Sequence, residues 1–375
     1  MKIGLVLERF DPKKGGLEHW TWQFAHRLIA LGHEVHVVAF EFAEPAAGTR
    51  LVFHRLAPSS SRLERAAVIE EKLRILKLDV IHDMGCGWYA DLFHPHGGST
   101  LALWEHNLKR IPRWRQIRFW REKRYRELAK IEKRQHASSK SLIVAVSQMV
   151  RNHFSTLHGV PPGRMRLIYN GVDPEKFSPE NNRELRGPTR FKLGCRNGEI
   201  LFLLVAHNLL LKNAEAAIRA ISRLIAVGAG VRLAIVGGKR QTRFIRLAAK
   251  LGVSSQVDFI ESVSDVRPYY AAADVYLHPT WYDPCSLVAL EAFACGLPVI
   301  TSRFNGVSEM MTDGTHGFIL DDPADIDALA GQMRLLLDPE VRKQMGESAR
   351  RLALEWTLDR QTAEFLALYH EISRV

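Results

Sequence analysis

Short apolar runs rich in β-branched residues alternate with amphipathic segments along this sequence, and that alternation most constrains the fold. Near the start, an apolar run at 3–7 and a polar loop precede a helical pattern over 17–31, and another run follows at 35–40. Runs at 80–82 and 142–146 continue the pattern. Continuous apolar strands separated by helices are typical of buried parallel sheets. The sequence therefore predicts an α/β fold with doubly wound parallel sheets.

The alternation starts again after about residue 198, which predicts a second domain of the same class. Its apolar runs, with helical patterns between them, fall at 200–206, 231–236, 257–260, 275–278, 299–301 and 318–320. The 375 residues also exceed the roughly 250–300 that one hydrophobic core supports. We expect two Rossmann-like domains that face each other across a cleft, where ligands of such folds bind.

The segment 174–198 contains several prolines and little apolar periodicity, so we place the linker there. This predicts a first domain over residues 1–180 and a second over 181–355. The tail 356–375 is helical and is expected to return to the first domain.

Composition excludes several classes of protein. With 46% hydrophobic and 25% charged residues, the chain is not of the disordered kind. Its longest apolar runs fall well short of the ~20 residues that cross a bilayer. A charge at Glu8 comes too early for a secretory signal, so we expect a cytoplasmic protein. The four cysteines are widely spaced, which favours free thiols over disulfides or a zinc site: Cys86, Cys195, Cys285 and Cys295.

The net charge of +11 is concentrated in one segment. Residues 109–134 hold twelve basic and three acidic residues, a local charge of +9. Within it, arginines flank an aromatic stripe: Arg113, Trp114, Arg115, Arg118, Trp120 and Arg121. Such a segment favours an anionic partner, either a membrane surface or a nucleic acid. The alternative is a solvated basic helix whose aromatic residues pack on the first domain.

Glycines stand where phosphates are often bound. Gly15 and Gly16 lie between the first predicted strand and helix, where backbone N–H groups can approach oxygen atoms without a Cβ in the way, although a plain turn explains the pair as well. Gly237 lies at the end of a predicted strand in the second half. Lys212 lies just before a predicted helix, where it could bind a diphosphate; the alternative is a solvated surface lysine. The absent G-x-G-x-x-G fingerprint argues against a dinucleotide enzyme.

The segment 278–300 carries the strongest signal. Pro284 fits a helix start, which predicts Asp283 at the N-cap and Glu291 in the second turn. Two carboxylates so placed can bracket a sugar nucleotide that lies across the helix N-terminus. The alternative is that Asp283 only caps the helix and Glu291 lies on its surface.

The spacing of Asp283 and Glu291 resembles the E-(x)7-E motif of the retaining, two-domain GT-B glycosyltransferases of family 4. Further passages resemble the same family: Gly15-Gly16, 144–147, 170–173 with Phe177, 271–279, and 305–309 with Gly314 and Gly317. The resemblance extends over nearly the whole chain. The version of the motif around Asp283 is similar to that of bacterial glucosyltransferases of the lipopolysaccharide core.

This resemblance implies that the enzyme moves a hexose, glucose in the most similar enzymes, from a UDP-sugar to a lipid-linked saccharide. It implies retention at the anomeric carbon with no metal ion and no cofactor. The first domain would take the acceptor and the second the nucleotide sugar. A lipid-linked acceptor would also explain the basic segment, as an anchor to the anionic inner face of the cytoplasmic membrane, with no nucleic acid as partner.

The resemblance also implies roles for single residues. Glu291 would hold the ribose, Asp283 would contact the donor sugar, and His96, with His94 as the alternative, would lie near the transferred sugar. The leaving diphosphate would be stabilised by Lys212, by amides near Gly15 and Gly16, and by the helix start at Cys285, Ser286 and Leu287. The base pocket would lie around Val263.

Two departures from the family are visible. The first acid of the pair is Asp283 instead of a glutamate, and the loop 207–212 lacks the arginine that commonly precedes the diphosphate lysine. Two alternative functions stay open at this point. They are a nucleic-acid-binding protein that uses the basic segment, and a family 4 transferase whose donor is GDP-mannose, UDP-galactose or UDP-N-acetylglucosamine.

Overall fold

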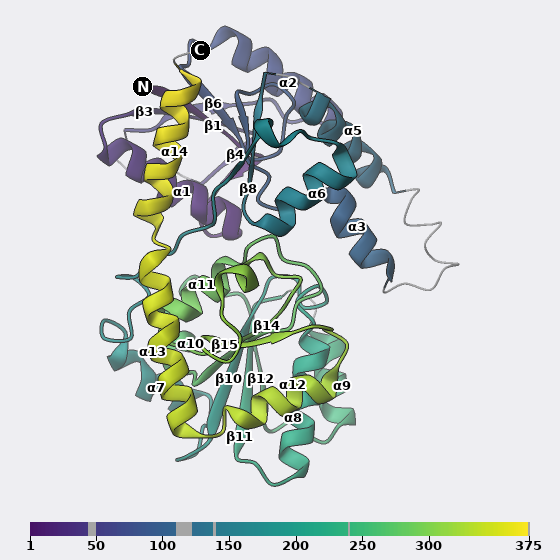
Figure 1. Cartoon of the computed structure of the whole chain (residues 1–375), viewed down its shortest axis with the longest axis vertical. Helices are drawn as coiled ribbons and strands as arrows, with labels where there is room; N and C mark the ends of the chain where they lie inside the picture. Colours follow the sequence, from purple (N-terminus) through teal and green to yellow (C-terminus); the bar gives the residue numbers. More distant parts are fainter. Residues whose placement is uncertain (44–49, 110–121, 138–139, 239–240, 374–375) are drawn as a thin grey trace. The chain divides into compact units, whose positions relative to one another are not determined.

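The computed structural model describes residues 1–43, 50–109, 122–137, 140–238 and 241–373 (Figure 1). The chain forms two compact units. The first comprises Met1–Tyr169 together with Leu358–Val375, and the second comprises Asn170–Thr357. The tail therefore belongs to the first unit.

The first unit contains a parallel sheet in the order β5-β3-β1-β6-β7-β8-β9. Its strands are β1 (Lys2–Val6), β3 (Glu34–Ala39), β5 (Val52–Arg55), β6 (Val80–Asp83), β7 (Leu92–Phe93), β8 (Leu142–Ala145) and β9 (Met165–Leu167). The short strands β2 (Arg9–Phe10) and β4 (Glu41–Phe42) form a separate pair. The chain order reverses at β1, which pairs with both β3 and β6, so the loops after these strands meet at a switch point.

The helices of the first unit are α1 (Gly16–Ala30), α2 (Arg62–Ile75), α3 (Thr100–Lys109), α5 (Lys123–Ala137), α6 (Gln148–His158) and α14 (Leu358–Ile372). A 3₁₀ turn, η1, spans Pro162–Arg164. Helix α14, drawn in yellow, packs beside α1, where the Trp20 indole donates a hydrogen bond to Gln361 Oε1 at 2.8 Å (Figure 1). The rings of Phe24 and Phe365 lie 5.3 Å apart, so apolar packing joins the same two helices.

The second unit contains a parallel sheet in the order β12-β11-β10-β13-β14-β15. Its strands are β10 (Ile200–Val205), β11 (Val231–Val236), β12 (Val257–Ile260), β13 (Val275–His278), β14 (Val299–Ser302) and β15 (Gly317–Leu320). Its helices are η2 (Arg183–Leu185), α7 (Arg186–Lys192), α8 (Ala214–Ala226), α9 (Thr242–Lys250), α10 (Arg267–Ala272), α11 (Leu287–Ala294), η3 (Gly306–Met310), α12 (Ile326–Leu335) and α13 (Pro339–Glu355). Both units are thus doubly wound, which confirms the predicted fold class.

The division between the units falls at Asn170, ahead of the proline-containing segment in which the linker is predicted. Polar contacts tie that segment to the second unit. The Asn170 amide donates to the Cys285 carbonyl at 2.7 Å, and Arg350 donates to the Pro174 carbonyl at 2.9 Å. Farther along, Arg186 pairs with Asp274 at 2.6 Å. The low apolar periodicity of 174–198 therefore reflects a polar docking segment of the second unit.

Candidate active site

Asp283 lies at the centre of a buried polar network in the second unit. Lys212 Nζ donates to Asp283 Oδ2 at 2.6 Å, and His278 Nε2 lies 2.9 Å from the same oxygen. Burial alone would raise the pKa of Asp283, but the charge of Lys212 and the hydrogen bond from His278 hold that pKa well below its usual range. Asp283 is therefore ionised at neutral pH and forms a buried ion pair with Lys212.

Both partners of this ion pair keep hydrogen-bonding capacity for a ligand. The Lys212 ammonium has three N–H groups and donates to Asp283 and, at 3.3 Å, to the Tyr282 carbonyl, which leaves one N–H. Asp283 Oδ1 accepts no hydrogen bond from the residues that the structure describes. The pair can thus offer a cationic donor to a phosphate and an anionic acceptor to a sugar hydroxyl.

The helix after Asp283 begins later than the sequence predicts. Helix α11 starts at Leu287, and its N-cap is Ser286, whose hydroxyl accepts from the Ala289 N–H at 3.4 Å. The prediction that Asp283 caps this helix was wrong, because Lys212 and His278 hold its carboxylate. Cys285, Ser286 and Leu287 still form the helix start, as predicted.

Glu291 lies in the second turn of α11, where the sequence places it. Its Oε2 accepts from the Tyr270 hydroxyl at 2.9 Å, and no described residue donates to Oε1. Burial raises the pKa of Glu291 to about 7. Glu291 is therefore close to half-protonated at neutral pH, and a ligand that donates hydrogen bonds to the carboxylate would favour its ionised form.

Sequence analysis assigned no role to three residues that support the site, although each lies in a segment that resembles the family. Asn305 Oδ1 accepts from the backbone N–H groups of Ser286 and Val307, both at 3.2 Å, and thereby ties the start of α11 to the loop after β14. Asn170 holds the Cys285 carbonyl, and His278 is the third partner of the ion pair. The signal for both asparagines is the repeated tripeptide Asn-Gly-Val at 170–172 and 305–307.

Gly237 follows β11 with φ +99°, and a Cβ there would lie 2.4 Å from the Ala206 carbonyl oxygen. Only glycine therefore allows the ends of β10 and β11 to approach so closely. A cavity of about 430 Å³ opens beside this crossing, lined by His207, Asn208, Leu209, Leu210, Gly238, Arg243 and Phe244. Val263 lies partly exposed in the loop between β12 and α10 and does not line this cavity.

In the first unit, Gly15 is the N-cap of α1 and no side chain caps this helix, so its first-turn N–H groups are open to a ligand. Gly16 is the first helical residue. A Cβ on Gly15 would lie 2.7 Å from Glu18 Oε2, so a larger residue there would displace the end of that side chain. That carboxylate is paired with Arg9 at 3.1 Å.

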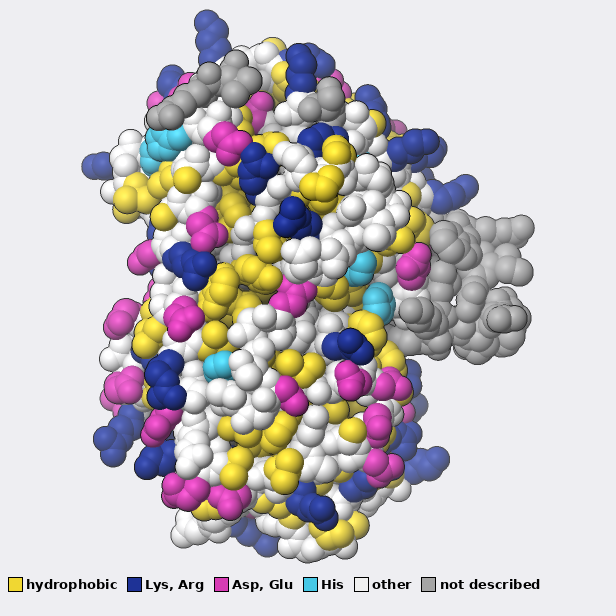
Figure 2. Space-filling model, viewed as in Figure 1, with side chains coloured by type: hydrophobic (Ala, Val, Ile, Leu, Met, Phe, Trp, Pro, Cys, Tyr) yellow, Lys and Arg dark blue, Asp and Glu magenta, His cyan; other side chains and the backbone are white. Residues whose placement is uncertain are grey.

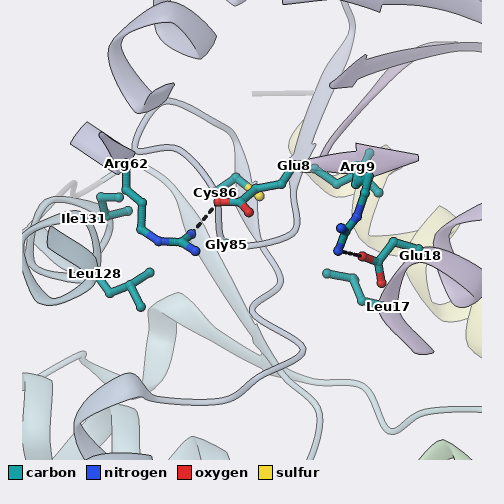
Figure 3. A pocket seen from close by; sticks show the side chains of 10 residues that line it. Glu8, Arg9, Leu17, Glu18, Arg62, Gly85, Cys86, Leu128 and Ile131 are labelled. Carbon is teal, nitrogen blue, oxygen red and sulfur yellow. Dashed lines mark hydrogen bonds and ion pairs between the residues drawn. The ribbon is translucent and has the colours of Figure 1, made fainter. Parts of the chain in front are cut away.

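A pocket of about 150 Å³ lies beside this helix start, at the ends of β1 and β6 (Figure 3). Two ion pairs line it, Arg62 with Glu8 and Arg9 with Glu18, and apolar side chains such as Leu17 complete it. A cavity of this volume holds a six-membered ring. Alternating cationic donors and anionic acceptors match a ring that carries hydroxyl groups.

His94 and His96 follow β7. The His94 and His96 rings lie 4.1 Å apart, and the Trp20 ring lies 4.4 Å from that of His96. Burial lowers the pKa of His96 to about 3 and that of His94 well below its usual value. Among the described residues, neither Nε2 atom has a hydrogen-bond partner although both are buried. Both rings are therefore neutral and leave a polar atom unused.

The aromatic and basic stripe predicted at Arg113, Trp114, Arg115, Arg118, Trp120 and Arg121 lies outside the described residues. On the face shown in Figure 2, the described Lys and Arg side chains are interspersed with Asp and Glu. No helix in the described part of the chain is both long and apolar enough to traverse a bilayer. Within the same residues, His, Cys, Asp and Glu side chains form no group of three suited to a metal ion.

Comparison with known proteins agrees with this arrangement. Residues 14–176 match the family described as Glycosyltransferase Family 4, and residues 186–352 match that described as Glycosyl transferases group 1. The chain is 28% identical over 374 residues to the GDP-mannose-dependent alpha-(1-6)-phosphatidylinositol monomannoside mannosyltransferase of Mycolicibacterium smegmatis. This match covers 94% of the chain and 93% of that protein.

Two further matches concern one kind of enzyme. The chain is 30% identical over 237 residues to the lipopolysaccharide glucosyltransferase WaaG of Escherichia coli K12. This match covers 61% of the chain and 62% of that protein. A crystal structure of WaaG, described as a glycosyltransferase involved in lipopolysaccharide biosynthesis, superimposes with a TM-score of 0.84 at 22% identity and covers 98% of this chain and 99% of that one.

Proposed function

Since the chain is a GT-B glycosyltransferase, with a Glycosyltransferase Family 4 domain followed by a group 1 domain, we propose that it transfers a hexose from a nucleoside diphosphate sugar to a saccharide acceptor with retention. UDP-glucose is the proposed donor and a lipid-linked saccharide the proposed acceptor. The similarity to a lipopolysaccharide glucosyltransferase supports glucose and a lipid-linked acceptor, and the resemblance of the segment around Asp283 supports UDP as the nucleotide.

The buried Lys212–Asp283 pair carries this proposal. A nucleoside diphosphate leaves with negative charge on its diphosphate, and the remaining N–H of Lys212 is a cationic donor held in place by Asp283. At the start of α11 the backbone N–H groups of Leu287 and Val288 have no acceptor among the described residues, and they add a partial positive charge in the same unit. We therefore propose that Lys212 and these amides stabilise the leaving diphosphate without a metal ion.

The proposed transfer proceeds on one face of the sugar ring. The bond between the anomeric carbon and the diphosphate oxygen breaks, and a bond to the acceptor oxygen forms on the same face. The acceptor proton passes to the departing diphosphate oxygen, so no protein nucleophile is needed. Asp283 Oδ1 would accept from a hydroxyl of the donor sugar, Glu291 from the ribose, and His96 would contact the transferred sugar.

We assign the acceptor to the pocket between the two Arg–Glu pairs of the first unit (Figure 3). Its two cations and two anions balance, which favours a neutral saccharide ring over a phosphate group. Replacing Glu8 with Gln should raise the KM for acceptor and leave the KM for donor unchanged. An unchanged acceptor KM would remove this assignment.

A ligand panel tests the function. We expect UDP to raise the melting temperature, whereas NAD and single-stranded RNA have no effect. Purified enzyme is then incubated with UDP-glucose, UDP-galactose, UDP-N-acetylglucosamine or GDP-mannose and a glycolipid acceptor, and products are identified by mass spectrometry. Transfer from GDP-mannose alone would favour the mannosyltransferase alternative, which the Mycolicibacterium relative supports. RNA binding without a nucleotide response would overturn the proposal.

We also propose that the enzyme works as a peripheral protein on the cytoplasmic face of an anionic membrane. Within the basic segment 109–134, helix α5 exposes Lys123, Arg126, Lys130 and Lys133, and each surface cation contributes about 1 kcal/mol on anionic lipid. Cosedimentation with phosphatidylglycerol vesicles at low salt should exceed that with phosphatidylcholine vesicles. Reversing Arg126, Lys130 and Lys133 to Glu should reduce it; equal pelleting with both lipids would contradict the proposal.

A further inference from the structure

In the first unit, a series of side-chain contacts connects Tyr369 on α14 to His96. The Tyr369 hydroxyl on α14 lies 2.6 Å from His82 Nδ1, at the end of β6. His82 Nε2 in turn lies 3.2 Å from His94 Nδ1, and the centroid of the His94 ring lies 4.1 Å from that of the tilted His96 ring. Tyr369, His82 and His94 are completely buried. Tyr369 and His82 have no role in the transfer proposed above, and His94 is there only the alternative to His96.

All four groups are neutral at physiological pH. Burial lowers the pKa of His82 and of His94 well below the usual value for histidine and raises that of Tyr369 well above its usual value. A neutral imidazole has one N–H and one lone pair. Each hydrogen bond along this series of contacts must therefore have a definite direction.

The Tyr369 hydroxyl determines the direction of the hydrogen bonds from Tyr369 through His82 to His94. The hydrogen bond to His82 is the one contact of the Tyr369 hydroxyl within the described part of the chain. If Tyr369 accepted from His82, its own buried O–H would have no acceptor, which is destabilising. In the opposite direction the donor left over is the Nε2–H of His94, which lies beside the Trp20 ring and can contact it. Tyr369 therefore donates to His82 Nδ1, His82 donates from Nε2 to His94 Nδ1, and the proton of His94 is on Nε2.

The series of contacts ends at His94 Nε2, beside the Trp20 ring. His94 Nε2 is buried without a hydrogen-bond acceptor among the described residues, and the Trp20 ring stands at 82° to the His94 ring with centroids 5.1 Å apart. An N–H directed at an aromatic face is a weak but orienting contact. Trp20 and His94 together enclose the His96 ring.

We infer that Tyr369 is a positioning residue for His96: its hydroxyl fixes one protonation pattern in His82 and His94, and so holds the His96 ring against Trp20. This inference rests on the proposed function, in which His96 contacts the transferred sugar. It gives the returning helix a part in catalysis besides its packing on α1.

The first test reads the protonation pattern directly. The full-length protein, labelled with ¹⁵N-histidine, is compared with Tyr369→Phe by long-range ¹H–¹⁵N correlation spectra. We expect His82 and His94 to show the pure Nε2–H form in the parent and averaged ¹⁵N shifts in the variant. His82→Gln and His94→Gln assign the two signals. Identical spectra of parent and Tyr369→Phe would overturn the inference.

The second test is a double-mutant cycle in the transfer assay. Tyr369→Phe should lower kcat about tenfold with an unchanged KM for donor, because a misplaced group slows chemistry more than binding. In the background of His96→Ala the same change should have no further effect. Equal losses in both backgrounds would show that Tyr369 does not act through His96.

Leu368→Ala is the matched control for helix docking. Leu368 is buried on the same helix and has no polar group, so its truncation should lower the melting temperature without altering the histidine spectra. A fall in kcat for Leu368→Ala equal to that for Tyr369→Phe would overturn the positioning role. Absence of transfer from every donor would instead refute the proposed function, while the spectra would still decide the protonation pattern.

Discussion

At the scale of single residues, Lys212 is the most informative position because its charge is both paired and still available to a ligand. Lys212→Met should lower transfer by roughly 10²-fold or more, since it removes a charged donor to the leaving diphosphate. It should also raise the pKa of Asp283, which then keeps only the hydrogen bond from His278. Steady-state kinetics with Lys250→Met, an exposed lysine of the same unit, as control check this; near-normal turnover would refute the assignment.

Glu291 should make donor binding depend on pH. In the proposed site the ribose hydroxyls donate to the ionised carboxylate, whose pKa burial raises to about 7, so affinity should weaken about tenfold from about pH 8 to about pH 6. Titration calorimetry with UDP-glucose, whose diphosphate does not titrate in this range, measures the change. Glu291→Gln should bind weakly at both pH values; a retained pH dependence in that variant would assign it to another group.

Rising pH should strengthen donor binding through Glu291 but lower the stability of the ligand-free fold. Because the folded-state pKa of Glu291 lies above its usual value, ionisation opposes folding, and stability is lost as pH rises through about 7. Glu291→Gln should therefore raise the melting temperature of the ligand-free enzyme at pH 8 while it weakens donor binding. Such a trade-off, in which removing a buried carboxylate stabilises the fold and weakens ligand binding, is expected at a binding site.

At the scale of elements, Gly237 links the packing of two strands to the candidate donor site. Gly237→Ala should destabilise the protein by more than the ~1–2 kcal/mol of a left-handed alanine, because its Cβ meets the Ala206 carbonyl at 2.4 Å. Gly228→Ala, with φ +82° and no atom within 4 Å of a Cβ, should show only the conformational cost. Urea unfolding compares the two, and equal losses would refute the close-approach argument.

The elements themselves could largely be predicted from the sequence, because buried parallel strands appear as apolar runs. The run at 231–236 is β11 residue for residue. The sequence analysis missed the two-residue strands β2, β4 and β7, the three-residue strand β9 and the four-residue strand β5. Their pairing depends on neighbouring strands more than on local pattern. The acidic pair was found by resemblance, whereas the N-cap at Ser286 depends on where Lys212 directs the Asp283 carboxylate.

At the scale of the whole molecule, the two units should differ in their ability to fold alone. The second unit is one continuous stretch, so a fragment of residues 170–357 should unfold cooperatively and bind UDP. A fragment of residues 1–169 lacks α14 and would expose Trp20 and Phe24, so it should not fold until a peptide of residues 358–375 is added. Circular dichroism and proteolysis distinguish these outcomes, and a stable fragment 1–169 would contradict the expectation.

The return of the chain to the first unit also sets an order of events during synthesis. Phe365 and Tyr369 fill the core of the first unit, yet the ribosome makes them after the whole second unit. At about 5–20 residues per second, the roughly 190 intervening residues take about 10–40 s to emerge. During that interval the first unit waits with an open apolar face while the second is completed. The domain translated first is thus finished last, once α14 has been made.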